Sequence, residues 1–152
     1  MCFAAACLVL MSSNSDAARR QRFVVTASLE RTARDSYVLN VALATQDNQP
    51  VTMYEADLPW GSAQSMTLIA ITTDRPGSVL ERELLVDDPS PRRVTLTSGH
   101  PLRGSINLSD GFRQFNESAE KGELVLFWSY RARPLTPLGD EQHAGWLLVP
   151  KR

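Results

Sequence analysis

The sequence predicts an all-β protein, a single antiparallel β-sandwich of about seven to nine short strands. Hydrophobic residues recur at every second position from residue 22 onward, which is the period of a strand. Turn residues interrupt these runs at intervals of roughly 8 to 12 residues. No amphipathic segment of about ten residues separates any two runs, so the chain has no helix to connect parallel strands. Its 152 residues suffice for one domain with a substantial core.

Four runs in the first half of the chain predict strands. They are residues 23–30, 37–44, 51–56 and 66–72. The cluster Thr45–Pro50 predicts a turn, because its Asp and Asn side chains can bond to nearby backbone. Pro59 ends the pairing after the third strand, since proline has no backbone N–H to donate. The fourth run, MTLIAIT, is apolar throughout, which is typical of a buried strand.

Four further strands are expected in the second half of the chain. They are residues 78–86, 93–97, 102–108 and 123–130. The last run, ELVLFWSY, has apolar residues on both faces, which indicates a central strand. We expect Trp128 in this strand to be the core tryptophan, packed between the two sheets. One short helical turn is expected near residues 109–117, capped by Ser109 or Asp110.

The amino-terminal segment predicts export. Met1–Met11 is apolar without interruption; it is too short to span a membrane and has the length of the apolar region of a signal peptide. Small residues at Ser15 and Ala17 predict cleavage before Ala18, which would place the mature chain in the periplasm or outside the cell. No Lys or Arg precedes the apolar run, so two alternatives stay open. One is a lipoprotein anchored at Cys7, and the other is an apolar segment that stays in the protein.

These signals define the expected domain organisation. Residues 1–17 are the expected signal peptide, and residues 18–152 form a single β-sandwich domain. Residues 134–152 are a loop-rich tail, within which Ala144–Val149 is a candidate edge strand. The loop itself, rich in Pro, Gly and Asp, is expected to run from Arg133 to His143.

Three landmarks carry a resemblance to a known family. They are the kink Leu58–Trp60, the stretch Gly104–Leu108 with Phe112 and Phe115 after it, and Leu126–Tyr130 on a late strand. Together they resemble bacterial immunoglobulin-like domains, and residues 24–133 are similar to the β-sandwich prodomain of deuterolysin-type metallopeptidases. The resemblance implies an immunoglobulin-like fold and a peptidase-associated role. It does not imply peptidase activity, because the chain contains no His-Glu-x-x-His motif.

Composition argues against several classes of function. The net charge is −1, from 16 basic and 17 acidic residues, so the chain lacks the excess of positive charge that is typical of nucleic-acid-binding domains. No segment has the length of a membrane span. Two histidines and two cysteines are too few for a typical structural metal site. The glycines are too scattered for a phosphate-binding loop, and no cofactor is expected.

The sequence also offers no clear set of catalytic residues. His100 is either a loop base or a solvated turn residue, and no Gly-x-Ser-x-Gly motif provides a nucleophile for it. His143 is either a metal ligand or a residue of a solvated loop. A calcium site would use Asp87 and Asp88 with Asp57, whereas the alternative is a turn in which these side chains bond to the backbone.

Four residues are the candidate binding positions: Trp60, His100, Tyr130 and Arg131. The Trp60 ring follows a proline at a strand end, where it either meets a ligand or packs against the sandwich edge. Tyr130 lies near a strand end, where its hydroxyl is expected to bond to a loop. Arg131 belongs to a small basic pair that either contacts an acidic partner or is solvated.

These observations favour a non-catalytic, exported binding or accessory domain that acts through protein–protein contacts at its loops or at an edge strand. The expected partner is an exported protein, and the family resemblance adds a narrower version in which an edge strand or loop engages a peptidase or another exported protein. The alternatives are a structural subunit of a surface assembly and a small hydrolase that uses His100. The sequence leaves the oligomeric state open.

Overall fold

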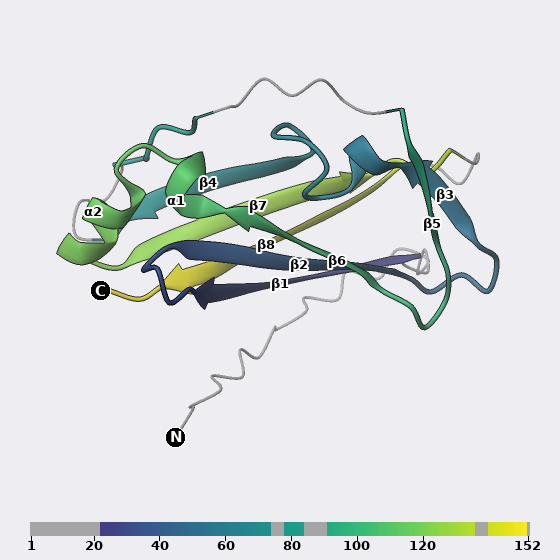
Figure 1. The fold of residues 1–152 in the computed structure, drawn as a ribbon, viewed down its shortest axis with the longest axis horizontal. Helices are drawn as coiled ribbons and strands as arrows, with labels where there is room; N and C mark the ends of the chain where they lie inside the picture. Colours follow the sequence, from purple (N-terminus) through teal and green to yellow (C-terminus); the bar gives the residue numbers. More distant parts are fainter. Residues whose placement is uncertain (1–21, 74–77, 84–90, 136–139, 152) are drawn as a thin grey trace, which may run out of the picture.

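The structure is a computed structural model that describes residues 22–73, 78–83, 91–135 and 140–151. Its strands all pair antiparallel, which confirms the all-β prediction (Figure 1). The strands are β1 (Phe23–Arg31), β2 (Tyr37–Thr45), β3 (Val51–Tyr54), β4 (Met66–Thr72), β5 (Arg93–Leu96), β6 (Leu102–Asn107), β7 (Leu124–Ala132) and β8 (Glu141–Val149). The helices are the 3-10 helix η1 (Glu55–Asp57), α1 (Leu108–Gly111) and α2 (Phe115–Lys121).

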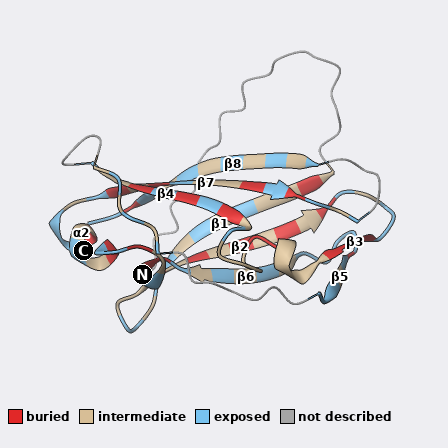
Figure 2. Cartoon of the chain, turned by 90° about the horizontal axis from the view of Figure 1, so that it is seen from above, coloured by how far each residue is buried: buried red, intermediate tan, exposed pale blue. Residues whose placement is uncertain are grey.

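Two three-stranded sheets lie face to face and enclose the core (Figures 1 and 2). Their strand orders are β1–β2–β6 and β4–β7–β8, and β3 pairs with β5 in a separate ribbon at one end. These orders match the A-B-E and C-F-G strands of an immunoglobulin-like sandwich. β1 contacts β8 on one side, where the Arg22 amide donates to the Glu141 carboxylate at 3.0 Å. β6 and β4 are therefore the edge strands on the other side.

Alternate residues of the strands point into the layer between the sheets. In β2 every odd-numbered residue is buried and every even-numbered residue is partly exposed, as the period of two requires. Trp128 lies on the inner face of β7 and packs against the core, which confirms its expected place. The Tyr37 and Phe115 rings meet edge to face, with centroids 5.7 Å apart, so α2 covers one end of this layer.

The strand expected at residues 78–86 is absent from its described part, residues 78–83. Only two isolated bridges form there, Val79 with Ile71 and Arg82 with Phe112. The Leu80 amide donates to β4, whereas the next backbone hydrogen bonds join this segment to α1 and the turn after it. The segment therefore divides its hydrogen bonds between two neighbours and never follows one strand long enough to form a ladder.

The helical turn expected near 109–117 is two short helices, α1 and α2. The cap of α1 is Asn107, and not Ser109 or Asp110 as expected: its Oδ1 accepts from the backbone N–H groups of both residues, at 3.0 and 3.3 Å. Gln114 has a φ of 59°, and this left-handed residue separates the two helices.

The carboxy-terminal strand is longer than the sequence predicts. β8 begins at Glu141, inside the stretch expected to be loop up to His143, and it pairs with β7 along its whole length. The pairing of Tyr130 with His143 and of Arg131 with Gln142 extends the ladder beyond the apolar residues. Ladder hydrogen bonds thus override the polar composition that indicated a loop.

Trp60 packs against Gly104 of β6. A Cβ atom on Gly104 would overlap the indole ring, so only glycine fits at this position. Gly104 belongs to the inward-facing set of β6, which means that the ring covers the inner side of this edge strand. The contact ties the chain after η1 to the sheet formed by β1, β2 and β6.

Gly104→Ala should lower the free energy of unfolding by about 1–3 kcal/mol, because the added methyl group forces the Trp60 ring out of its place. Urea denaturation followed by tryptophan emission measures this loss. Gly111→Ala is the matched control, since no atom lies within 4 Å of its added Cβ. Equal stability of Gly104→Ala and the parent chain would contradict the packing described here.

Candidate functional site

A groove of about 240 Å³ opens between the edge strands β6 and β4. Its floor is apolar and is formed by Trp60, Leu68, Ile106 and Phe112. Trp60 packs on Gly104 at the sandwich edge, which is one of the two roles that the sequence left open, and it also lines the groove. The floor is continuous with the core, because Leu68 and Phe112 are buried while Trp60 and Ile106 are partly exposed.

Arg82 stands at the wall of this groove. Its Nη1 donates to the Met66 carbonyl at 2.9 Å, and its Nη2 donates to the Ala63 carbonyl at 2.6 Å. Burial lowers the pKa of the Arg82 guanidinium from its usual value, because desolvation disfavours the charged form. The side chain thus braces residues 62–66 against the segment 78–83. No local pattern in the sequence marks Arg82, since its partners are carbonyl groups 16 and 19 residues away.

The edge of β6 beside this groove has no strand partner within the described ranges. β6 pairs with β2 along one side only, from Leu102 to Asn107. In an antiparallel pair, every second residue of an edge strand points its backbone N–H and C=O away from its neighbour. An unpaired row of donors and acceptors therefore runs along an apolar groove.

The four binding positions predicted from the sequence do not come together. Tyr130 is buried in the core, and its hydroxyl donates to the carbonyl of Asp57 at 2.9 Å, so its partner is the last residue of η1 and not the expected loop. Burial raises the pKa of this hydroxyl, and the Asp57 carboxylate adds to the effect. Arg131 is exposed and forms an ion pair with Asp140 at 3.4 Å. His100 is exposed in the turn between β5 and β6.

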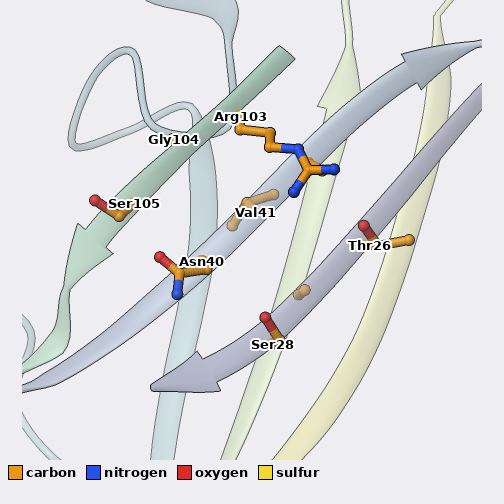
Figure 3. A pocket seen from close by; sticks show the side chains of 9 residues that line it. Thr26, Ser28, Asn40, Val41, Arg103, Gly104 and Ser105 are labelled. Atoms are coloured by element: carbon orange, nitrogen blue, oxygen red, sulfur yellow. The ribbon is translucent and has the colours of Figure 1, made fainter. Parts of the chain in front are cut away.

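A second depression, of about 570 Å³, lies over the outer face of β1, β2 and β6 (Figure 3). The Arg103 side chain reaches from β6 across β2, and Thr26 and Ser28 of β1 lie opposite (Figure 3). Asn40 lies between these strands, and its amide donates to the Glu30 carboxylate at 2.6 Å. Small polar side chains of this kind are typical of the solvated face of an antiparallel sheet.

The structure describes only one of the three aspartates of the predicted calcium site, Asp57. Asp87 and Asp88 lie outside the described residues, so the calcium site at these positions stays a prediction. Asp57 ends η1. Among the described residues, no three His, Cys, Asp or Glu side chains form a group that would hold a metal ion.

His143 is not the solvated loop residue that one alternative predicts. It lies on the inner face of β8 with 9% of its side chain exposed, and its Nε2 is 3.4 Å from the Glu141 carboxylate. Neither of these two atoms has a hydrogen-bond partner among the described residues. Burial lowers the pKa of the His143 imidazole, and the Glu141 carboxylate partly offsets this.

Neither the protein-family models nor the curated proteins with which the sequence was compared give a match. None of the helices in the described ranges has the length and apolar character that a membrane span requires.

The buried His143 should make stability depend on pH. Its pKa is lowered in the folded chain, so its contribution is complete above the ordinary imidazole value of about 6.5 and is lost as the pH falls below it. Thermal unfolding measured between about pH 8 and pH 5 should show this loss, and His143→Gln should flatten it. Carboxylates other than Glu141, which faces His143, contribute alike in both proteins and cancel in the comparison. The same pH profile in parent and variant would contradict the assignment.

Proposed function

We propose that this chain is a non-catalytic binding domain that accepts an extended segment of another protein along the free edge of β6. The observation that carries the proposal is the position of the groove beside that edge. Addition of a strand to β6 would pair the open backbone groups, and this pairing needs no particular sequence in the partner. Side-chain selectivity would come from the groove.

The lining of the groove indicates which segment fits. An added strand directs every second side chain toward the floor made by Trp60, Leu68 and Ile106. A volume of about 240 Å³ suits one apolar side chain of medium or large size. Three charged residues line the groove, Arg82, Glu83 and Asp110. Glu83 is paired with Arg113 at 3.3 Å, and Arg82 and Asp110 carry opposite charges, so the groove as a whole favours neither an acidic nor a basic segment. The preferred partner is an extended segment with alternating apolar residues.

The partner is proposed to be an exported protein, with a peptidase as the narrower form suggested by the resemblance to prodomains of deuterolysin-type metallopeptidases. This part of the proposal is supported by the apolar run Met1–Met11 and the small residues that follow it. A hydrolase that uses His100 has no comparable support, because His100 is exposed in a turn and lines neither of the two cavities.

Gly111→Trp tests the strand-accepting groove. Gly111 lines the groove and has no atom within 4 Å of an added Cβ, so a large side chain there fills the groove without disturbing the fold. Linear peptides selected from a displayed library against the full chain serve as probes, with affinity measured by fluorescence anisotropy. We expect the variant to weaken their binding about tenfold or more, and bound peptide to protect the β6 amides from hydrogen exchange.

Thr26→Trp is the matched control, because it adds the same ring to the outer face of the same sheet. It should bind the peptides as the parent does. Peptides that bind Gly111→Trp and the parent equally, or a library that yields no binder, would count against the groove.

Export predicts a processed amino terminus. Intact-mass measurement and amino-terminal sequencing of the protein from fractionated cells of its own host should find a chain that begins near Ala18, in the periplasm or the medium. An unprocessed chain that begins at Met1 in the cytoplasm would contradict export and leave the groove to be judged on its own.

A further inference from the structure

The outer face of the sheet β4–β7–β8 is apolar and exposed. Two cross-strand rows form it, Ile69–Phe127–Trp146 and Ile71–Val125–Leu148, and Val79 extends the second row beyond β4. We call these seven residues the apolar face. Five of them remain 42–59% exposed: Ile69, Phe127, Leu148, Trp146 and Val79. The sequence predicted apolar residues on both faces of β7, and the structure covers only the inner one.

This face differs from the usual solvated side of an antiparallel sheet, which is polar. The other sheet of this same chain follows the usual pattern, with Thr26, Ser28 and Asn40 on its outer face (Figure 3). In Figure 2 the exposed colour recurs along β8, the outermost strand of the apolar sheet. A continuous exposed apolar patch of this kind is typical of a site where another molecule, or another part of the protein, packs.

Charge on and around this face favours a second copy of the chain as that cover. On one side the next row, Thr67–Ser129–Ala144, is uncharged, and Arg131 beyond it is already paired with Asp140. On the other side the exposed Glu123, two residues before Val125, is a charged residue at the rim of the face. Selection of a different protein usually relies on complementary charges, and this face presents none. The seven residues of the apolar face carry no charge and do not repel their counterparts in a second copy, and the net charge of −1 adds almost no repulsion between whole chains.

The size of the face fits a dimer interface. A fully exposed aromatic side chain presents roughly 150–250 Å², so the five exposed side chains together offer on the order of 500 Å² of apolar surface. A stable interface buries about 800 Å² on each partner and has an apolar centre with a polar rim. Ile71, Val125 and the uncharged row Thr67–Ser129–Ala144 supply the remainder, with the polar residues at the rim.

We propose that this chain forms a symmetric dimer in which the apolar faces of two copies pack against each other. The same patch then serves both partners, as a two-fold interface requires. Twisted sheets pack face to face about 10 Å apart, and Trp146, the most exposed aromatic residue of the face, is the expected centre of the contact. The groove of each copy opens between β6 and β4 and takes in the inward-facing Leu68, not the outer face of β4–β7–β8, so the dimer leaves both grooves open.

Sedimentation velocity of the full chain over a series of micromolar concentrations tests the dimer. We expect the parent to shift from monomer to dimer as concentration rises, and Trp146→Glu to raise the dissociation constant about tenfold or more. The control is Leu135→Glu. Leu135 is 42% exposed but lies beside β3, where its N–H donates to Thr52 at 2.9 Å, and it should leave the equilibrium unchanged. Circular dichroism at low concentration checks that each variant folds, and Phe127→Ser serves as a second variant of the face.

Three results would overturn the dimer. The first is a parent chain that stays monomeric at every concentration. The second is association of equal strength in Trp146→Glu, which would place the contact elsewhere, such as the apolar run Met1–Met11. The third is a monomer whose tryptophan emission is quenched by iodide no more than that of Trp146→Phe, because another part of the same chain then covers the face. None of these bears on peptide binding at β6, which the Gly111→Trp comparison decides separately.

Discussion

The contact between the Trp60 ring and Gly104 is the interaction on which the open side of the sandwich depends. A glycine within an edge strand leaves a gap on the inner face, and the indole ring fills that gap from a segment outside the sheet. The ring could not approach so closely over any other residue. It thereby holds the connection between η1 and β4 at β6, and this connection supplies one wall of the groove. The groove exists because the strand beneath Trp60 has no side chain at one position.

The other sheet also has a glycine in close contact with a tryptophan ring. A Cβ atom on Gly145 of β8 would lie 2.7 Å from the Trp128 ring, which belongs to the neighbouring strand. Each sheet therefore has one edge strand with an inward-facing glycine under an indole ring. The two differ in what lies beyond the ring. Trp128 packs within its own sheet against the core, whereas Trp60 comes from a connecting segment and keeps part of its surface on the groove.

Local sequence patterns predict the strands well because burial on one face imposes a period of two, as in β2. They fail where the hydrogen-bond partners of a residue are distant in the sequence, and where its exposure depends on what packs outside its sheet. Residues 78–83 carry a strand-like pattern, but their hydrogen bonds go to two neighbours. The central place of β7 followed from its apolar residues, yet the exposure of Phe127 depends on what packs outside the sheet, which no local pattern encodes. Arg82 was missed for the same reason, since its carbonyl partners come from a distant loop and strand.

β4 connects the two surfaces on which the proposals rest. Leu68 points inward and forms part of the groove floor, while the next residue, Ile69, points outward into the apolar face. Because side chains alternate with a period of two, a slip of one residue in the pairing of β4 with β7 would exchange these roles and move polar Thr67 into the core. The buried residues of β4 prevent such a slip, since their burial is strong on one face only. The register that builds the core therefore also fixes, on opposite sides of one strand, the surface proposed for an extended segment and the surface proposed for a second copy.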